Sequence, residues 1–277
     1  MKAYLIYTAY EAARNEWFAK RFIELGKSCG IDFSLLIWED ISISFCGGKA
    51  EIYYKGEKLP APDFAVNRTQ DHLLSLHFEN AGVRVFNSSE VSRICNNKML
   101  TFELAATLGL PFMDTAYHES TSDDITLPAV LKPLDGKGGR DVVLVKDREE
   151  LEAALPIFAG RPFLSQRVAS DVGRDHRIYV MGGRVMASFL RFSDSDFRSN
   201  YGINGNAEPL EPDAFELEAI DKIVSVLHPD FVGIDFIFDG GRPVFNEIED
   251  CVGSRMVYRY TDIDAADEYI KHILRSL

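Results

Sequence analysis

The chain has 277 residues, and its 30 lysines and arginines against 43 aspartates and glutamates give a net charge of −13 at pH 7. This length allows two domains or one domain with lobes, and it is ample for a sizeable core. The acidic balance argues against a duplex nucleic-acid surface, which needs clustered lysine and arginine, but it leaves room for a local basic pocket that binds a small anion.

The cysteines and the first residues of the chain indicate the cellular compartment in which the protein folds. Cys29, Cys46, Cys95 and Cys251 form no C-x-x-C pair, which favours reduced thiols over a structural disulfide. The start, MKAYLIYTAYEAARNEW, has a short apolar run that soon becomes charged, unlike a signal peptide. No stretch approaches the ~20 apolar residues of a membrane span. The sequence therefore predicts a cytoplasmic protein.

The first part of the chain alternates strands with helices. Strands are expected at residues 3–7, 33–37, 63–69 and 83–87, with helices near 12–28 and 71–81. Residues 42–59 indicate a polar hairpin with turns at Gly47-Gly48 and Lys55-Gly56. Alternation of this kind is typical of a parallel α/β layer.

The rest of the chain is richer in strands. The stretch CNNKMLTFELAATLGLP (95–111) predicts a helix that Asn96 or Asn97 caps and that ends at Gly109 and Pro111. The strands expected after it cover residues 129–134, 140–146, 162–168, 176–181 and 184–191, followed by two within 231–250. A polar loop is expected at 193–209, with helices near 213–228 and 264–276.

The stretch LKPLDGKGGRDVVLV (131–145) has the glycines and lysine of a phosphate loop, but not in P-loop order. A P-loop reads GxxxxGK[ST] before a helix, whereas here a strand-like segment follows and no Ser or Thr follows the lysine. We therefore expect residues 135–139 to form a flap between antiparallel strands, with backbone N–H groups available to phosphates. A plain hairpin turn also explains the glycines. Lys132, in an apolar strand, must find an anion or snorkel to solvent.

The stretch GIDFIFDGGRPVFNEIED (233–250) predicts an acidic hairpin. With a three-residue loop at 240–242, Asp235 lies opposite Glu247 and diagonal to Glu249, and Phe245 shares the face of the two glutamates. Like charges so close need a cation, and three oxygen-bearing side chains suit Mg²⁺. A two-residue loop would place Asp235 and Glu247 on different faces. The alternative is a solvated face with lysine or arginine partners.

Five segments together resemble the ATP-grasp carboxylate–amine ligases, most closely the RimK-type branch. In family order, over about residues 67–255, they are NKMLTFELAATLGLP, LPAVLKPLDGKGGRDVVLV, FLSQRVASDVGRDHRIYVMGGRVMASFLR, DFRSN and VGIDFIFDGGRPVFNEIE. The resemblance implies an ATP-grasp fold, of mixed α/β and α+β class, with ATP between two lobes. Its parts would be an N-terminal Rossmann-like layer at residues 1–95, a small lobe with the glycine flap at 96–160, and a C-terminal lobe with a metal site at 161–277.

The resemblance also implies roles for individual residues. Lys98 and Lys132 look like the lysines that touch the phosphates and the adenine side. Residues 165–168 (SQRV) resemble the hinge strand whose backbone reads adenine, and Asp175 resembles a ribose carboxylate. The nucleotide-binding set implied is Lys98, Lys132, Gly136, Gly138, Gly139, Gln166, Arg167, Val168, Asp175, Arg198, Ser199 and Asn200. The implied catalytic set is Lys132, Arg177, Arg191 and Arg198, and the metal ligands are Asp235, Glu247 and Glu249.

The chain departs from the family pattern in several places. Arg167 stands where the family usually has Glu, and Glu249 where it has Asn; Glu249 still supplies an oxygen, with one more negative charge. The stretch YGINGNAEP (201–209) lacks the basic residues of close relatives, and CVGSR (251–255) replaces the usual NPG. The substrates of well-known members are therefore not transferred to this chain. Arg177 and Arg191 have a second interpretation as surface or salt-bridged arginines.

The activity implied is ligation that depends on ATP and Mg²⁺ or Mn²⁺. A carboxylate would be phosphorylated to an acyl phosphate with release of ADP, and an amine, of an amino acid or peptide, would then displace phosphate. Arg68, at the end of a predicted strand, and Arg255 are candidates to pair with a substrate carboxylate, or ordinary capping or salt-bridged arginines. The alternatives are an ATP-grasp kinase and a non-catalytic nucleotide-binding module. No nucleic-acid or membrane partner is expected, and a homo-oligomer is expected from general frequency and from the habit of the family that the chain resembles, not from any residue here.

Overall fold

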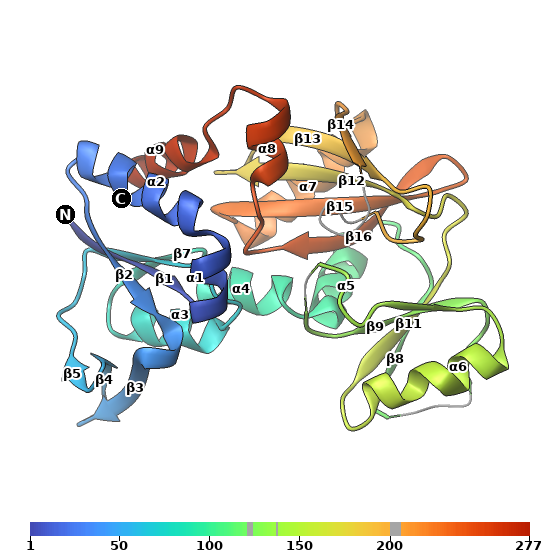
Figure 1. Ribbon diagram of the computed structural model, residues 1–277, viewed down its shortest axis with the longest axis horizontal. Coiled ribbons are helices and arrows are strands. Elements are labelled where there is room, and N and C mark those ends of the chain that lie inside the picture. The colour runs from blue at the N-terminus through green and yellow to red at the C-terminus, as the bar shows by residue number, and fades with distance from the viewer. Residues whose placement is uncertain (121–123, 137, 200–205) are drawn as a thin grey trace.

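The computed structural model describes residues 1–120, 124–136, 138–199 and 206–277. The N-terminal layer lies at one end of the long axis of the molecule, and the other two large sheets lie at the opposite end, one above the other in this view (Figure 1). Both chain termini lie at the N-terminal layer (Figure 1). The position of the candidate site follows from how these three sheets are built and joined.

The N-terminal layer is a four-stranded parallel sheet in the order β2-β1-β6-β7, so the predicted parallel α/β layer is confirmed. The apolar run of β1 is buried along its whole length, as expected for a strand covered on both faces. The elements are β1 (Lys2–Tyr7), α1 (Ala9–Arg14), α2 (Glu16–Ser28), β2 (Asp32–Ile37), η1 (Trp38–Asp40), β6 (Phe64–Asn67), α3 (His72–Asn80), β7 (Arg84–Phe86) and α4 (Ser89–Cys95). The expected hairpin is a separate three-stranded sheet of β3 (Ile41–Cys46), β4 (Lys49–Tyr54) and β5 (Glu57–Lys58).

The single helix expected near residues 12–28 is instead two helices, α1 and α2, separated at Asn15. The side chain of Thr8 caps α1 by accepting a hydrogen bond from the Glu11 amide. The Asn15 side chain donates to the carbonyl oxygen of Glu11 at 2.9 Å. Asparagine competes with the helical backbone in this way, which explains the break.

The second sheet has the order β10-β9-β11-β8 and is antiparallel throughout. Asn97 caps α5, since its side chain accepts from the amides of Met99 and Leu100. Strand β11 lies beyond the boundary expected at residue 160, so this sheet continues further along the chain than the expected lobe. The elements are α5 (Lys98–Thr107), β8 (Thr115–His118), β9 (Ala129–Pro133), β10 (Val143–Val145), α6 (Arg148–Ala154), η2 (Leu155–Phe158) and β11 (Phe163–Arg167).

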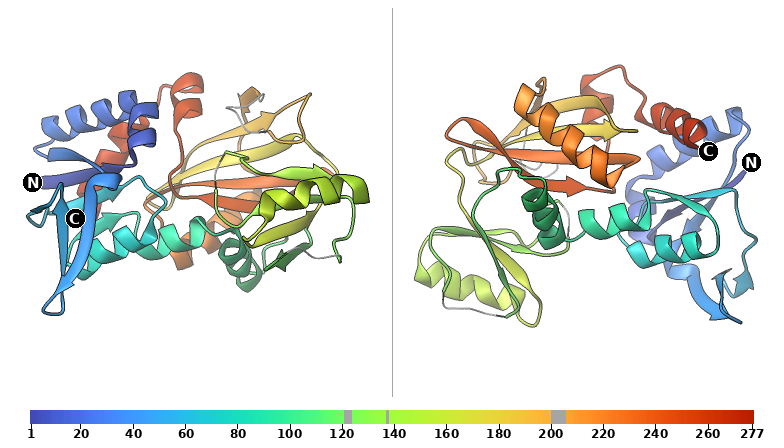
Figure 2. Two further views of the ribbon diagram at one scale, coloured as in Figure 1. Left: turned by 60° about the horizontal axis from the view of Figure 1, so that its bottom comes forward. Right: turned by 180° about the vertical axis from the view of Figure 1, so that it is seen from behind.

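The third sheet is antiparallel, in the order β14-β13-β12-β15-β16. Its apolar face packs against α7, α4 and α5, and α7 lies across it in the rear view (Figure 2). Strand alternation then turns the other face, which carries charged side chains, toward the second sheet. The elements are β12 (Arg174–Met181), β13 (Arg184–Phe192), β14 (Asn206–Pro209), α7 (Ala214–Leu227), β15 (Phe231–Asp239), β16 (Arg242–Glu249), α8 (Arg255–Tyr260) and α9 (Ala265–Ser276).

The acidic hairpin differs from its prediction in two ways that cancel. The loop is the two residues Gly240-Gly241, since Asp239 pairs with Arg242, so the expected three-residue loop is wrong. A β-bulge then inserts Asn246 into β16, and Asp235 pairs with Glu247 after all. Because Phe245 lies before the bulge, it pairs with Phe236 and is buried in the core instead of sharing a face with the glutamates.

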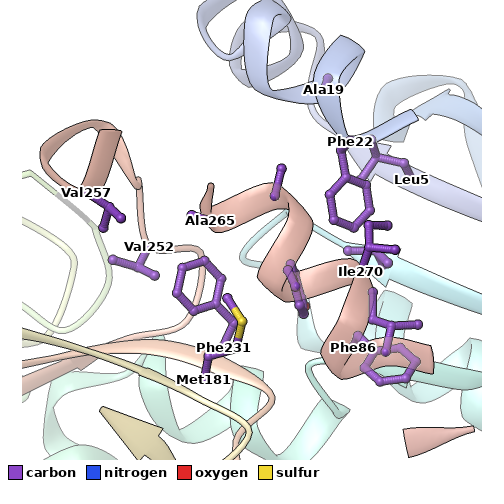
Figure 3. Packing of buried hydrophobic residues seen from close by; sticks show 14 of the residues in the cluster. Leu5, Ala19, Phe22, Phe86, Met181, Phe231, Val252, Val257, Ala265 and Ile270 are labelled. Atoms are coloured by element: carbon purple, nitrogen blue, oxygen red, sulfur yellow. The ribbon is translucent and has the colours of Figure 1, made fainter. Parts of the chain in front are cut away.

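The C-terminal helix joins the ends of the chain. Although α9 follows the C-terminal lobe in sequence, it packs against α2 of the N-terminal layer. Figure 3 shows Ile270 of α9 facing Phe22 and Leu5, with Phe231 of β15 in the same apolar cluster. The N-terminal layer and the third sheet therefore share one core, which fixes the N-terminal layer beside the charged face.

The buried side chain of Asn87 makes a polar link between the same two parts. Its amide nitrogen donates to the Phe231 carbonyl at 2.8 Å and to Asp250 at 2.6 Å, and its oxygen accepts from the amides of Asp230 and Phe231 at 2.7 and 2.9 Å. We expect Asn87→Ala to cost roughly 3 kcal/mol of unfolding free energy, because it leaves several buried groups without partners. Urea denaturation measures this cost. Asn80→Ala, at an exposed position, is the control, and equal stability of the two variants would contradict the prediction.

Candidate active site

A cleft lies between the second and third sheets, and both contribute side chains to it. We call it the first cavity. Most residues expected to bind nucleotide or metal line it, and Asn200 lies outside the described residues. The expected residues that line it are Lys98, Lys132, Gly136, Gly138, Gly139, Gln166, Arg167, Val168, Asp175, Arg191, Arg198, Ser199, Asp235 and Glu247.

A second cavity lies against the N-terminal layer. Its lining includes the remaining expected residues, Arg68, Arg177, Glu249 and Arg255. The two cavities share Gly138, Arg140, Arg191 and Glu247. The fold therefore brings the two sets of predicted residues to adjoining cavities, with one end of the flap between them.

Arg177 is the centre of a buried ion-pair network. It pairs with Asp235 on the neighbouring strand through two hydrogen bonds, one of 2.6 Å, and with Glu249 through its Nη1 atom. The side chains of Arg177 and Asp235 are only 5% and 1% exposed. Burial by itself opposes ionisation of Asp235, but Arg177 and Arg191 outweigh it and lower the pKa of this carboxyl group. Glycine is required at position 233, where a Cβ atom would lie 2.9 Å from Cδ of Arg177.

Arg191 extends this network to Asp175. Its Nε and Nη2 atoms donate to the two oxygens of Asp175, each at 2.6 Å, and Nη2 also donates to Asp235 at 2.8 Å. Arg177 and Arg191 are thus salt-bridged, the second interpretation that the sequence left open, while they also line the cavities. Both oxygens of Asp175 are engaged by Arg191 in this structure.

Two lysines approach this face from the second sheet. Nζ of Lys132 donates to Gln166 at 2.7 Å and to Asn246 at 3.0 Å. Burial lowers the pKa of Lys132 to about 8, although Glu247 partly opposes this shift. Nζ of Lys98 donates to the Gly136 carbonyl at 3.1 Å and lies 3.6 Å from Glu247. The lysines therefore tie the flap and the second sheet to the acidic hairpin.

Two of the expected nucleotide arginines have specific partners. Arg198 pairs with Asp196 at 2.7 Å and donates to the Gly139 carbonyl of the flap at 3.2 Å. Arg167 pairs with Asp239 at 2.9 Å, at the far end of the acidic hairpin. Arg167, which stands where the family usually has glutamate, therefore has a local electrostatic partner in Asp239.

The acidic side chains are held by cations and do not form a preassembled metal site. Within the described ranges, no group of three histidine, cysteine, aspartate or glutamate side chains is placed to hold a metal ion. Glu247 and the bulged Asn246, which lie beside the two lysines, present carboxylate and amide oxygens, the ligand type that hard cations prefer. The donor chemistry fits Mg²⁺ or Mn²⁺.

Among the lining residues that sequence reasoning missed, Asn246 and Arg140 bear most directly on the chemistry of the site. Asn246 reaches Lys132 only because of the bulge, and no sequence signal marks a bulge at that position. Arg140 lines both cavities, directly after the flap. Its position beside the glycines was a usable signal, since a cation there would face the same anion as the flap.

Comparison with known proteins identifies the family. Residues 111–273 match the RimK-like ATP-grasp domain, over more than half of the chain. The chain belongs to the RimK-like ATP-grasp family. The expected family and ATP-grasp fold are confirmed, and the chain is an ATP-dependent enzyme that joins a carboxylate to an amine.

Two relatives and two solved structures illustrate the similarity. A "Probable alpha-L-glutamate ligase" of Maridesulfovibrio salexigens is 29% identical over 80% of this chain and 79% of its own length. A protein of the same name from Methanococcoides burtonii is 26% identical over 95% of this chain and 93% of its own length. The RimK domain ATP-grasp protein of Sphaerobacter thermophilus has a TM-score of 0.71 at 16% identity, over 99% of this chain and 100% of that protein. D-cycloserine synthetase DcsG has a TM-score of 0.73 at 17% identity, over 100% of this chain and 99% of that protein.

The RimK-like chain has no membrane-spanning candidate among its described helices, since none is both long and apolar enough to cross a bilayer.

Proposed function

We propose that Mg²⁺-ATP binds in the first cavity, with its terminal phosphate at the boundary with the second cavity, where the reacting carboxylate and the amine meet. The observation that carries this proposal is the set of residues common to both cavities: Gly138 and Arg140 at the flap, and Arg191 and Glu247 on the charged face. This boundary combines backbone N–H groups, arginines and a carboxylate. Such groups can bind and stabilise a phosphoryl group that passes from one cavity to the other.

Glu247, Glu249 and Asp235 are the residues that would hold the metal. Bound there, the metal neutralises charge on the transferred phosphoryl group. Arg177 offsets the additional negative charge of Glu249, because its Nη1 atom already pairs with that carboxylate. Lys132, Arg191 and Arg198 surround the phosphates as cations, while the flap excludes water from the reacting centre.

The reaction proposed has two steps. An oxygen of the substrate carboxylate attacks the terminal phosphorus, which gives an acyl phosphate and ADP. The amine nitrogen then attacks the acyl carbon, the amide bond forms, and inorganic phosphate leaves with the oxygen that came from the carboxylate. The second cavity is proposed to hold an amino acid or a small peptide. Positioning and charge stabilisation suffice for phosphoryl transfer, so no covalent nucleophile is required of the protein.

The proposed reaction is tested by the products it releases. The protein is incubated with Mg²⁺-ATP and pools of amino acids and dipeptides, and ADP and free phosphate are measured separately. Equal release of both, dependent on a carboxylate and an amine together, is the expected result. ADP without free phosphate would identify a kinase. Release of neither product from any pool, by a protein that binds Mg²⁺-ATP, would contradict the proposal and favour a non-catalytic module.

The low pKa of Lys132 predicts that nucleotide affinity depends on pH. With a pKa of about 8 in the free protein, Lys132 is charged at pH 7 and loses its proton as the pH rises above 8. If the charged form binds phosphate, the Kd for a non-hydrolysable Mg²⁺-ATP analogue increases about tenfold between pH 8 and 9.5. Lys132→Arg keeps its charge over this range, so its Kd should stay nearly constant. An equally flat profile for the wild type, measured by calorimetry, would contradict the role of Lys132.

A further inference from the structure

A third cavity lies beside the second one, and the proposed reaction places nothing in it. Its volume is about 290 Å³, whereas a cavity of about 150 Å³ is already large enough for a benzene ring. The third cavity shares Glu11, Arg68 and Arg140 with the second cavity, and it shares Gly136 of the flap with the first. It therefore adjoins both of the cavities that the proposed reaction uses.

The third cavity lies at the carboxyl ends of three parallel strands of the N-terminal layer. Its lining includes Thr8, which follows β1, Trp38, which follows β2, and Arg68, which follows β6. In the order β2-β1-β6-β7, the chain passes from β1 to β2 on one side, while β6 lies on the other side of β1. Open α/β sheets bind ligands at such a switch point. The position of the third cavity therefore indicates a binding site.

Two aromatic side chains line the third cavity. Tyr10, on α1, is 63% exposed. Trp38 is half-buried and packs against the apolar cluster of the N-terminal layer that includes Leu36, so its indole has a fixed support. A ligand that covers these two rings removes apolar surface from water, and aromatic rings pair favourably edge-to-face or offset. The lining therefore suits an apolar group, and an aromatic ring best.

The charged residues of the third cavity balance one another. Arg68 and Arg140 face Glu11 and Asp71, whereas the second cavity has six arginines against three glutamates. The Asp71 side chain also caps α3, since it accepts from the Leu74 amide at 3.0 Å. A cationic ligand would meet the two arginines, and an anionic ligand would meet the two carboxylates. The occupant favoured by this lining is therefore uncharged.

Arg68 lies where the second and third cavities adjoin. It is only 8% exposed and donates from Nη2 to the Val252 carbonyl at 2.8 Å. Its Nε atom is buried without a hydrogen-bond partner, and within the described ranges no other buried side-chain nitrogen or oxygen lacks one. A ligand that satisfies this donor offsets the cost of leaving it unpaired. An amide carbonyl oxygen on a chain that runs from one cavity to the other can accept this hydrogen bond.

We infer that the third cavity binds the aromatic side chain of a peptide-like substrate whose reacting end lies in the second cavity, with an amide carbonyl of that substrate at Nε of Arg68. The inference rests on the proposed function, because it adds a subsite to the same reaction path. It goes further than that function, which assigns no group to the third cavity. The ring belongs either to the carboxylate substrate or to the amine substrate, and the two are distinguished by experiment.

Trp38 itself reports whether the third cavity is occupied. The chain has two tryptophans, Trp17 and Trp38, so the Trp17→Phe variant leaves Trp38 as its single indole fluorophore. This variant, saturated with a non-hydrolysable Mg²⁺-ATP analogue, is titrated with N-acetyl-Phe-Ala, which has a free carboxylate, and with Ala-Phe-amide, which has a free amine. Each probe is compared with its leucine and lysine counterparts.

At least one phenylalanine probe should change the Trp38 emission and bind five or more times as tightly as its leucine counterpart. The probe that does so identifies the substrate that carries the ring. The lysine counterparts should bind no more tightly than leucine. Equal binding of phenylalanine and leucine, binding of neither, or tighter binding of lysine would overturn the inference.

A matched pair of tyrosine variants locates the ring. Tyr10→Ala, at an exposed position, should reduce the phenylalanine preference to less than twofold. Tyr117→Ala, at an exposed position on β8 outside the three cavities, is the control and should leave the preference unchanged. A preference that survives Tyr10→Ala would also overturn the inference. Analogue binding and product release are recorded separately, so a failure of the proposed function is distinguishable from the absence of a ring preference.

Discussion

Glu247→Gln is expected to lower the rate of ADP release by at least about 100-fold, the scale on which loss of one group that stabilises the transition state acts. Glutamine keeps the shape of the side chain and one oxygen, but it removes the negative charge. In the proposed function that charge holds the metal, and Glu247 also lies at the boundary of the two cavities, 3.6 Å from Lys98. Its loss therefore acts on the phosphate and on the metal together.

The control for this variant is Glu218→Gln. Glu218 lies on α7, which covers the opposite face of the same sheet, and its 67% exposed side chain pairs with Lys222. The Glu218→Gln variant should retain wild-type turnover. Steady-state ADP release is measured for both variants, together with their thermal unfolding temperatures, which should stay close to that of the wild type. A Glu247→Gln protein that keeps more than a third of the activity would contradict the assigned role.

Arg177→Met is expected to destabilise the fold by about 3–5 kcal/mol, the usual cost of removing one partner from a buried ion pair. Asp235 would remain 1% exposed with Arg191 as its remaining cation, and Glu249 would lose the partner that its carboxylate has now. Urea denaturation at neutral pH measures the effect. Arg174→Met, on the same strand at an exposed position, should change stability by less than about 0.5 kcal/mol.

A double-mutant cycle separates the two partners of Arg177. If Glu249 is held in place by Arg177, the combined variant Arg177→Met/Glu249→Gln should be more stable than the sum of the single changes predicts, by about 1 kcal/mol or more. Strict additivity of the two changes would mean that the Arg177–Glu249 contact contributes nothing. In that case the proposal that Arg177 offsets the additional negative charge of Glu249 would be wrong.

Local features of the fold could be predicted from the sequence because their causes are local. Asn97 was recognised as one of two possible caps, and the glycines at 47–48 and 55–56 as turns between polar strands. The sequence predicts that residues 135–139 link antiparallel strands, because a strand-like segment and not a helix follows the glycines, and β9 and β10 do pair antiparallel. These conclusions required only neighbouring residues.

The remaining features depend on contacts between distant parts of the chain. The register of the acidic hairpin was deduced with the wrong loop length, and Asp235 met Glu247 only because the bulge at Asn246 compensated. The pairing of Arg177 with Asp235 requires β12 to lie beside β15, which no periodicity reveals. Likewise, the position of α9 against α2 is set by apolar packing across almost the full length of the chain.

The most direct measurement of the central claim follows the carboxylate oxygens. The carboxylate substrate is first identified by testing smaller and smaller subsets of the amino-acid and dipeptide pools. It is then labelled with ¹⁸O at both oxygens and turned over with the amine and Mg²⁺-ATP. Mass spectrometry of the products should find one ¹⁸O atom in each inorganic phosphate and the other in the new amide, because the acyl phosphate transfers one carboxylate oxygen to phosphorus. Phosphate free of ¹⁸O would contradict the account, since the carboxylate would not have been phosphorylated.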